Sequence, residues 1–146
     1  MAEQVRYLVL AAQREGNRRL ATALGEIGLT PAQSEVLRIL GDHSGLTLHG
    51  VGAMLVCDSG TNPSRLIEKL VRAGLVERTA DPSDRRSMRL SLTASGAAAE
   101  RRVRMIEDAL YAQIDAVPDA AALARMLQPL VSGTVAGEAL RKRIEG

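Results

Sequence analysis

The chain has 146 residues and a net charge of +2, and it is 46% hydrophobic and 25% charged, which predicts one globular domain with a hydrophobic core. Tyr7 and Tyr111 are its only aromatic residues, which argues against recognition of single strands by base stacking. One cysteine, Cys57, excludes an intramolecular disulfide framework. No apolar run approaches the roughly 18 residues of a membrane span, and no apolar leader opens the chain, so we expect a cytoplasmic protein without membrane contact.

The positive charge is concentrated in one part of the chain. Residues 59–92 contain seven Lys or Arg and four Asp or Glu, an excess of three, whereas the remainder has an excess of one negative charge. A local cationic excess of this size is a modest indication of a surface that binds a polyanion such as DNA.

Residues 2–27 are predicted to form the first helix. Apolar residues recur there at steps of three and four, Gly16 interrupts the pattern, and Gly28 closes it. A second helix begins with strong signals, because Thr30 can cap it, Pro31 suits the first helical position and Gln33 completes a capping box. Its buried face contains Val36, Leu37 and Leu40, and Gly41 ends it.

Two further helices joined by a turn are predicted to follow. Leu46-Thr47 is long enough for a single rung of a sheet, and the apolar residues of 48–55 indicate a short helix. The next helix has its apolar face at Leu66, Ile67, Leu70 and Val71. Its opposite face carries Thr61, Asn62, Ser64, Arg65, Lys69 and Arg72. A small polar tip with a basic flank is what the DNA major groove accepts, although an ordinary amphipathic surface helix has the same pattern.

The start of this basic helix is open to two interpretations. Ser59 could cap it, which places Pro63 inside the first turn, where proline removes a backbone donor. Alternatively, Asn62 is the cap and Pro63 is the first helical residue. We adopt a loose first turn near Gly60 that tightens after Pro63.

A β-hairpin is predicted over residues 76–92. Val76–Thr79 and Met88–Leu92 are the candidate strands, because Met88, Leu90 and Leu92 alternate with polar residues. The connecting loop has turn chemistry around Pro82 and projects Arg85 and Arg86. A helix-turn-helix followed by such a hairpin is a winged helix.

The C-terminal third is predicted to be helical. Thr93 caps a long helix to about Val117, which Pro118 ends, and another follows over 123–131 with an irregularity at Pro129. Thr134 caps a last helix through Ile144. Together with residues 1–27, these helices carry more apolar surface than a small winged helix can cover, so we expect a symmetric homodimer.

This order of elements resembles the MarR family (multiple antibiotic resistance regulators) of dimeric winged helix-turn-helix transcription factors. The resemblance is carried by LTPAQSEVLRIL (29–40), SRLIEKLVRAGLVER (64–78) and DPSDRRSMRLSLTASG (81–96), with the flanking helices. It implies a mainly α fold with a small β-wing, in which a winged helix-turn-helix lobe (28–96) is flanked by helical dimerisation regions (1–27 and 97–146).

The resemblance also implies the roles of individual residues. Residues Thr61, Asn62, Pro63, Ser64 and Arg65 would face base edges of double-stranded DNA, with Lys69 and Arg72 behind them on the same stripe. Asp84, Arg85 and Arg86 match a wing-tip motif in which an arginine enters the minor groove and the aspartate helps to orient it. A small-molecule effector, where one exists, would bind between the dimerisation helices and the DNA-binding lobe. The segment Gly60–Pro63 departs from the plainer helix start of many members.

Other chemistry is weakly supported. Cys57 closes its helix next to Asp58, a setting that favours a small buried hydrophobe over a reactive thiol. His43 and His49 match no zinc spacing, so we expect no metal site and no cofactor. No phosphate-binding glycine loop and no serine elbow is present, so we expect no enzyme.

The leading hypothesis is a sequence-specific DNA-binding regulator, acting as a ligand-responsive repressor. Phosphate contacts from Arg72, Arg78 and Arg89 would position it, and the basic helix would specify bases. One alternative is a winged-helix protein-interaction module that does not bind DNA. Another is a redox-sensing regulator, whose DNA affinity would respond to peroxide and lose that response in Cys57→Ser.

Overall fold

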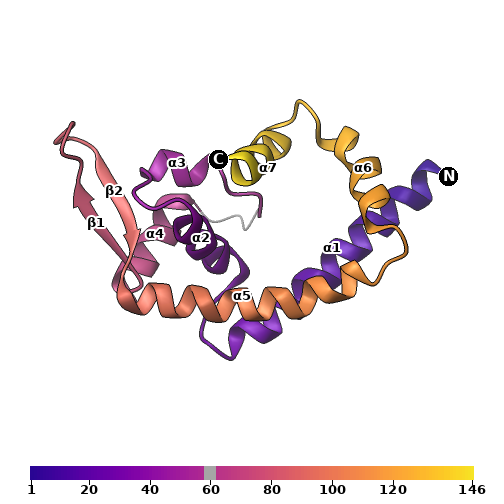
Figure 1. The fold of residues 1–146 in the computed structure, drawn as a ribbon, viewed down its shortest axis with the longest axis horizontal. Coiled ribbons are helices and arrows are strands. Elements are labelled where there is room, and N and C mark those ends of the chain that lie inside the picture. Colours follow the sequence, from indigo (N-terminus) through magenta and orange to yellow (C-terminus); the bar gives the residue numbers. More distant parts are fainter. Residues whose placement is uncertain (58–61) are drawn as a thin grey trace.

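The computed structural model describes residues 1–57 and 62–146, which form seven helices and a two-stranded sheet (Figure 1). The fold class is the predicted one, mainly α with a small β-wing. No helix in the described residues is long and apolar enough to cross a membrane. In chain order the elements are α1 (Ala2–Gly25), α2 (Pro31–Asp42), α3 (Leu48–Gly52), α4 (Pro63–Arg72), β1 (Val76–Ala80), β2 (Met88–Leu92), α5 (Ala94–Asp115), α6 (Ala120–Val131) and α7 (Val135–Glu145).

Local capping chemistry sets the helix starts that the sequence predicted. The Thr30 side chain accepts a hydrogen bond from the Gln33 backbone N–H, and the Gln33 side chain accepts one from the Thr30 N–H, which completes the capping box of α2. Thr93 caps α5 and Thr134 caps α7 in the same way, each accepting from the N–H three residues on. These contacts satisfy backbone donors that a helix start otherwise leaves unpaired.

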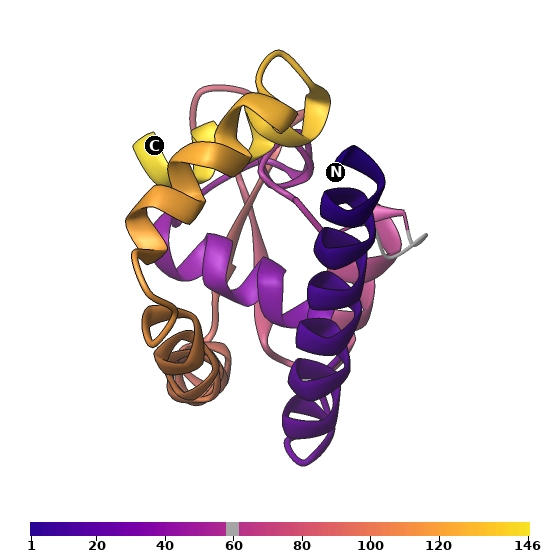
Figure 2. The ribbon, with the colours of Figure 1, turned by 90° about the vertical axis from the view of Figure 1, so that its right-hand side faces the viewer.

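The hydrophobic core lies around α2. Its Val36, Leu37 and Ile39 are fully buried and pack with Leu24 at the end of α1 and Val103 of α5. Figure 2 shows α2 running between α1 and α5, and all three helices are in mutual contact. Further core residues come from α3, α4 and the sheet: Val51, Leu66, Ile67, Leu70, Val76 and Leu90.

The sheet is an antiparallel hairpin with a third, short rung. Val76 pairs with Leu92 and Ala80 with Met88, and Leu46 forms the predicted rung by bridging Leu90. Gly96 fixes how closely α5 follows the sheet, because a Cβ at this position would lie 1.8 Å from the Leu75 carbonyl oxygen. Any side chain there would force the start of α5 away from β1.

Several element boundaries differ from the sequence predictions. The first helix is not interrupted at Gly16, because that exposed position packs against nothing and its glycine costs only about 1 kcal/mol relative to alanine. The helix also ends at Gly25 rather than Ile27. The predicted irregularity at Pro129 is absent, since α6 continues through it to Val131. Pro129 has no backbone N–H to donate to the residue four positions earlier, but the helix does not end there.

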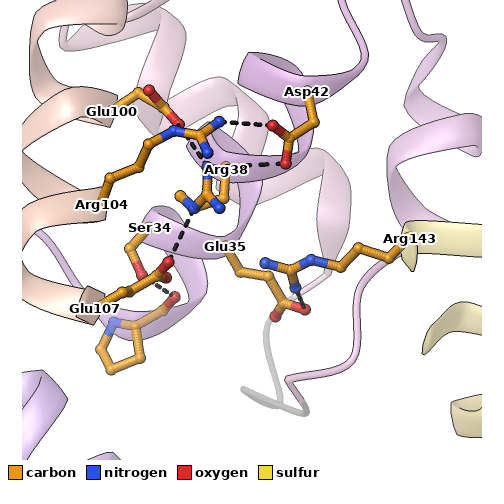
Figure 3. A network of polar contacts seen from close by, with 9 residues as sticks. Ser34, Glu35, Arg38, Asp42, Glu100, Arg104, Glu107 and Arg143 are labelled. Atoms are coloured by element: carbon orange, nitrogen blue, oxygen red, sulfur yellow. Dashed lines mark hydrogen bonds and ion pairs between the residues drawn. The ribbon is translucent and has the colours of Figure 1, made fainter. Parts of the chain in front are cut away.

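An ion-pair network joins α2 to α5 (Figure 3). Arg38 donates to Glu100 at 2.7 Å and to Glu107 at 2.9 Å, and Arg104 donates to Asp42 at 2.6 Å. Burial disfavours charge on Asp42, but the hydrogen bond from Arg104 and the charge of Arg38 outweigh it and hold the pKa of Asp42 below its usual value. The network therefore fixes the long helix against the core helix with paired charges.

The terminal helices, in contrast, leave apolar side chains in solvent. No residue of α6 is buried, and α7 buries only Ala139. Large apolar side chains exposed on these helices and on α1 include Tyr7, Leu8, Met126, Leu130, Val135 and Ile144. The described chain therefore has a complete core at one end and an uncovered apolar surface at the other.

Candidate nucleic-acid interface

The helix α4 is held by its apolar face. Leu66, Ile67 and Leu70 are buried in the core, and α4 contacts α2, α3 and β1. The opposite face is polar and exposed, and it carries Ser64, Arg65, Glu68, Lys69 and Arg72. The helix is thus fixed on one side and available to a ligand on the other.

The start of α4 follows the second interpretation of the sequence. Asn62 is the N-cap, accepting a hydrogen bond from the Ser64 N–H at 2.8 Å, and Pro63 is the first helical residue. The loose turn near Gly60 that we adopted, and the predicted base contact of Thr61, lie outside the described residues. Because the Asn62 side-chain oxygen is used as a cap and Pro63 has no donor, these two residues build the helix start, while Ser64 and Arg65 present polar groups beyond it.

A shallow hollow of about 520 Å³ lies between α3 and the start of α4. Its walls include Leu48 and His49 from α3 and Asn62, Pro63 and Ser64 from the tip of α4. The short helix and the polar tip therefore form one continuous surface, as in a helix-turn-helix.

The three cations of α4 differ in their pairing. Arg72 donates to Glu68 at 2.5 Å on the same helix. Among the residues that the structure describes, Arg65 and Lys69 form no such ion pair, and both are exposed. Arg65, the third residue of α4, is the exposed cation of this helix nearest its N-terminal tip.

The wing tip is shaped by backbone hydrogen bonds. The Asp84 carboxylate accepts the Arg86 backbone N–H at 3.0 Å, and the Ser87 N–H donates to the Asp84 carbonyl at 2.9 Å. Asp84 therefore braces the turn through its backbone and leaves the side chains of Arg85 and Arg86 exposed. The wing and α4 lie at the same end of the molecule, away from the N-terminus (Figure 1).

Asp81 and Arg89 hold the place where the wing loop leaves the strands. Asp81, which is buried, accepts from the Ser83 backbone N–H and hydroxyl and from the Arg89 guanidinium at 2.8 Å, and these partners hold its pKa below the usual range. Arg89 also donates to the Gly45 carbonyl at 3.0 Å, which ties the wing to the loop before α3. The Arg89 guanidinium thus bonds to Asp81 and Gly45 within the chain while 42% of its side chain stays exposed, and its predicted phosphate contact stays a prediction.

A cavity of about 510 Å³ lies where α1, α2, α5 and α7 meet the end of the α3–α4 connection. Its lining includes Glu35, Cys57, Glu107, Tyr111 and Arg143. Burial and the neighbouring Glu107 carboxylate raise the pKa of Tyr111, which therefore keeps its proton. This is the position between the terminal helices and the DNA-binding lobe at which the family resemblance places an effector.

Glu35 was missed by the sequence analysis. It is buried, and its carboxylate accepts the backbone N–H of Val56 at 2.7 Å and of Cys57 at 2.9 Å. The available signal was a carboxylate directly beside the apolar run Val36-Leu37 on a core-facing helix. The same contacts explain why the expectation of a buried Cys57 is wrong. Glu35 holds the backbone there, and the Cys57 side chain is exposed.

Metal ligation has no geometric support in residues 1–57 and 62–146, where no three His, Cys, Asp or Glu side chains cluster as a metal site requires. His43 and His49 belong to different elements, at the end of α2 and within α3.

Comparisons with known proteins agree with this geometry. A family model described as a winged helix DNA-binding domain matches residues 29–96. An organic hydroperoxide resistance transcriptional regulator of Bacillus subtilis is 31% identical over 97 residues, which cover 66% of this chain and 65% of that protein. The regulator SarZ of Staphylococcus saprophyticus is 28% identical over 133 residues, 90% of each protein.

Solved structures extend the similarity to almost the whole chain. A variant of E. coli MarR in complex with operator DNA superposes with a TM-score of 0.74 at 25% identity, covering 88% of this chain and 94% of that one. CouR from Rhodococcus jostii, bound to p-coumaroyl-CoA, gives a TM-score of 0.74 at 26% identity, covering 91% and 95%.

The fold and the basic surface define a winged helix-turn-helix protein of the DNA-binding class. The chain has the fold of the MarR-family transcriptional regulators, which include the solved structures that it resembles at 25% identity.

Proposed function

We propose that this protein is a sequence-specific regulator that binds double-stranded DNA as a homodimer and represses transcription until an effector releases it. The observation that carries this proposal is the placement of two exposed arginine-bearing elements, α4 and the wing tip, at one end of a rigid lobe. A regulator of this kind acts on the chromosome, so the proposal includes the expected cytoplasmic location, and it assigns the protein no enzymatic role.

In this proposal α4 enters the major groove with Ser64 and Arg65 leading. An arginine there can bind guanine O6 and N7 with two hydrogen bonds, which discriminates one base pair from the others. Lys69 and Arg72 lie one and two turns behind and contact phosphates, which positions the helix without reading sequence.

The wing supplies a second kind of contact. Arg85 and Arg86 project from its tip and would lie at the minor groove, whose hydrogen-bond code distinguishes bases poorly. Their attraction is mainly electrostatic and strongest where an A·T-rich groove is narrow.

The uncovered apolar surface supports the dimer. Many of the large exposed apolar side chains lie on α1, α6 and α7, for example Leu8, Met126, Leu130 and Ile144. A second copy of the same surface would cover them with two-fold symmetry. A two-fold dimer reads two equivalent half-sites, so the operator is an inverted repeat.

The effector site in this proposal is the cavity of about 510 Å³ beside α7. It touches the terminal helices and the connection to α4 at once, so a bound molecule can favour one arrangement of the two over another. CouR, a similar protein, was solved with p-coumaroyl-CoA, which supports a small-molecule effector for this chain without identifying it.

Selection of bound duplexes from a random pool tests the proposal. We expect an inverted repeat whose half-site centres lie about 10 base pairs apart, with binding that weakens steeply as salt increases. A protein-interaction module that does not bind DNA would be retained neither on heparin nor on random duplex. A single asymmetric site would contradict the two-fold docking, and a lack of any duplex binding would contradict the function.

A further inference from the structure

Three separate parts of the chain meet at the buried Glu35 carboxylate. Glu35 belongs to α2, and it accepts the backbone N–H groups of Val56 and Cys57 from the connection between α3 and α4. The third partner is Arg143 of α7, whose Nη1 donates to Glu35 Oε1 at 2.6 Å although the two residues are 108 positions apart (Figure 3).

The Glu35 carboxylate is well suited to bind the backbone at Val56 and Cys57. Two acceptor oxygens receive two successive N–H donors, and an ionised acceptor makes each bond stronger than a neutral one would be. Val56 and Cys57 directly precede residues 58–61, which are not described, and α4 begins at Pro63. The position of these two amides therefore constrains where the chain enters the polar tip of α4.

The charge on Glu35 makes the arrangement depend on α7. Only 8% of its side chain is exposed, whereas 24% of the Arg143 side chain is exposed. A buried carboxylate needs a compensating cation, and loss of that partner leaves an unfavourable charge in the protein. Arg143 supplies the cation from the C-terminal helix. If α7 moves away, Glu35 is driven toward water and its bonds to the two amides weaken.

We propose that Glu35 positions the segment leading into α4, and that Arg143 makes this positioning depend on the place of α7. Glu35 and Arg143 are thus positioning residues for base recognition, linking the terminal helices to the DNA-reading tip through one ion pair. This inference rests on the proposed function, because it specifies how the terminal helices regulate the DNA-binding surface.

The chain contains a matched control for Arg143. Arg141 lies on the same helix, and it pairs with Glu138 at 2.9 Å and with Glu145 at 3.1 Å, both on α7 itself. Arg141→Met therefore removes the same charge from the same helix without touching the connection to α4. Arg143→Lys serves as the conservative variant, because Arg143 uses a single nitrogen on Glu35 and an ammonium can replace one such contact.

The experiment uses the full-length protein and two measurements. Amide hydrogen exchange by NMR reports the Val56 and Cys57 bonds directly. Binding to the selected duplex and to a random duplex of equal length reports base recognition. For Arg143→Met we expect about tenfold faster exchange at these two amides and about a tenfold smaller ratio of selected to random affinity. Random-duplex affinity and the exchange of core amides in α2 should match the wild type, as should every measurement on Arg141→Met.

The conservative variant Arg143→Lys should restore both measurements, and three outcomes would overturn the inference. Arg143→Lys should recover most of the exchange protection and most of the affinity ratio. The inference is overturned if Arg143→Met behaves like the wild type, if Arg141→Met shows the same losses, or if Arg143→Lys is no better than Arg143→Met. A wild-type protein that cannot distinguish the selected from the random duplex contradicts the proposed function instead, and the exchange measurement still decides whether Arg143 acts on Val56 and Cys57.

Discussion

The winged-helix lobe and the terminal helices use similar apolar periodicity with opposite results. In the lobe, Leu37, Ile67 and Leu70 are at most 1% exposed. In the terminal helices, Met126 and Leu130 are more than 60% exposed although they recur at the same helical spacing. Periodicity shows that a helix has an apolar face, and only the fold shows whether the same chain covers it.

This difference separates two kinds of stability. The core of the lobe is completed within the same chain, because Leu24 of α1 and Val103 of α5 pack with the buried residues of α2. In the proposed dimer, the terminal helices would gain their burial from association, so their order would depend on protein concentration. In the proposed function, the lobe carries the surface that contacts DNA, and the terminal helices give the complex its two-fold symmetry.

Breaking the dimer should produce the largest effect. We expect Leu130→Glu combined with Ile144→Glu to give a folded monomer, because both side chains are largely exposed within the single chain. Affinity for an inverted repeat should fall by roughly 100-fold or more, since linked half-sites gain about 10²–10⁴ from bivalency. Sedimentation and binding titrations measure both effects. A wild-type protein that is monomeric at micromolar concentration would contradict this prediction.

Damaging the core of the lobe should instead reduce stability at every concentration. Leu37→Ala removes a fully buried side chain and should cost about 2–5 kcal/mol of unfolding free energy. Met126→Ala is the matched control, and below the dimer dissociation constant it should cost less than about 0.5 kcal/mol. Denaturant unfolding at two protein concentrations tests the pair. Equal losses in both variants would mean that the two regions do not differ in this way.

Base reading should be a property of the lobe alone. Arg65→Ala should cost about 1–3 kcal/mol at the selected site and relax the preference at one position per half-site, without changing dimerisation. Arg85→Ala and Arg86→Ala should weaken all duplexes more evenly and flatten the salt dependence. Salt-titrated binding to the selected site and to half-site variants distinguishes them. If the wing variants change base preference and Arg65→Ala does not, the roles are reversed.

The smallest expected effect is a local change with pH. The partners of Asp81 lower its pKa in the folded state, so its contribution is present above the unfolded value of about 4 and is lost as pH falls through the lower folded value. The Ser83 amide should therefore stay protected from exchange at pH 5 and lose protection only below about pH 4. In Asp81→Asn this transition should be missing. Loss of wing order already at pH 5 would contradict the assignment.

Local signals in the sequence predicted most of the fold. Thr30, Thr93 and Thr134 each carry their capping information within a few residues, and the structure uses all three. The alternation at Met88, Leu90 and Leu92 likewise predicted a strand that the structure contains. These signals succeed because the interactions behind them span three or four positions.

Contacts between distant residues were not predictable in this way. No residue near Glu35 in the sequence indicates that Arg143 will pair with it. Likewise, no residue near Arg89 indicates that Arg89 will donate hydrogen bonds to Asp81 and to the Gly45 carbonyl. We predicted a phosphate contact for Arg89 from its charge alone, and the sequence did not show that Arg89 also pairs with Asp81. The residue-by-residue DNA contacts therefore remain predictions, and the geometry supports Arg65, Arg85 and Arg86 more directly than it supports Asn62 or Pro63.

The bond from Arg89 to the Gly45 carbonyl has a mechanical consequence. It fastens the hairpin to the loop before α3, so we expect it to restrict how far the spacing between the wing tip and α4 can adjust to the duplex. A duplex whose twist and groove width already match that spacing should bind with little distortion, whereas another must be wound or bent to fit. We therefore expect base pairs that no side chain touches, between the two contacted grooves, to influence affinity through the torsional stiffness of the DNA.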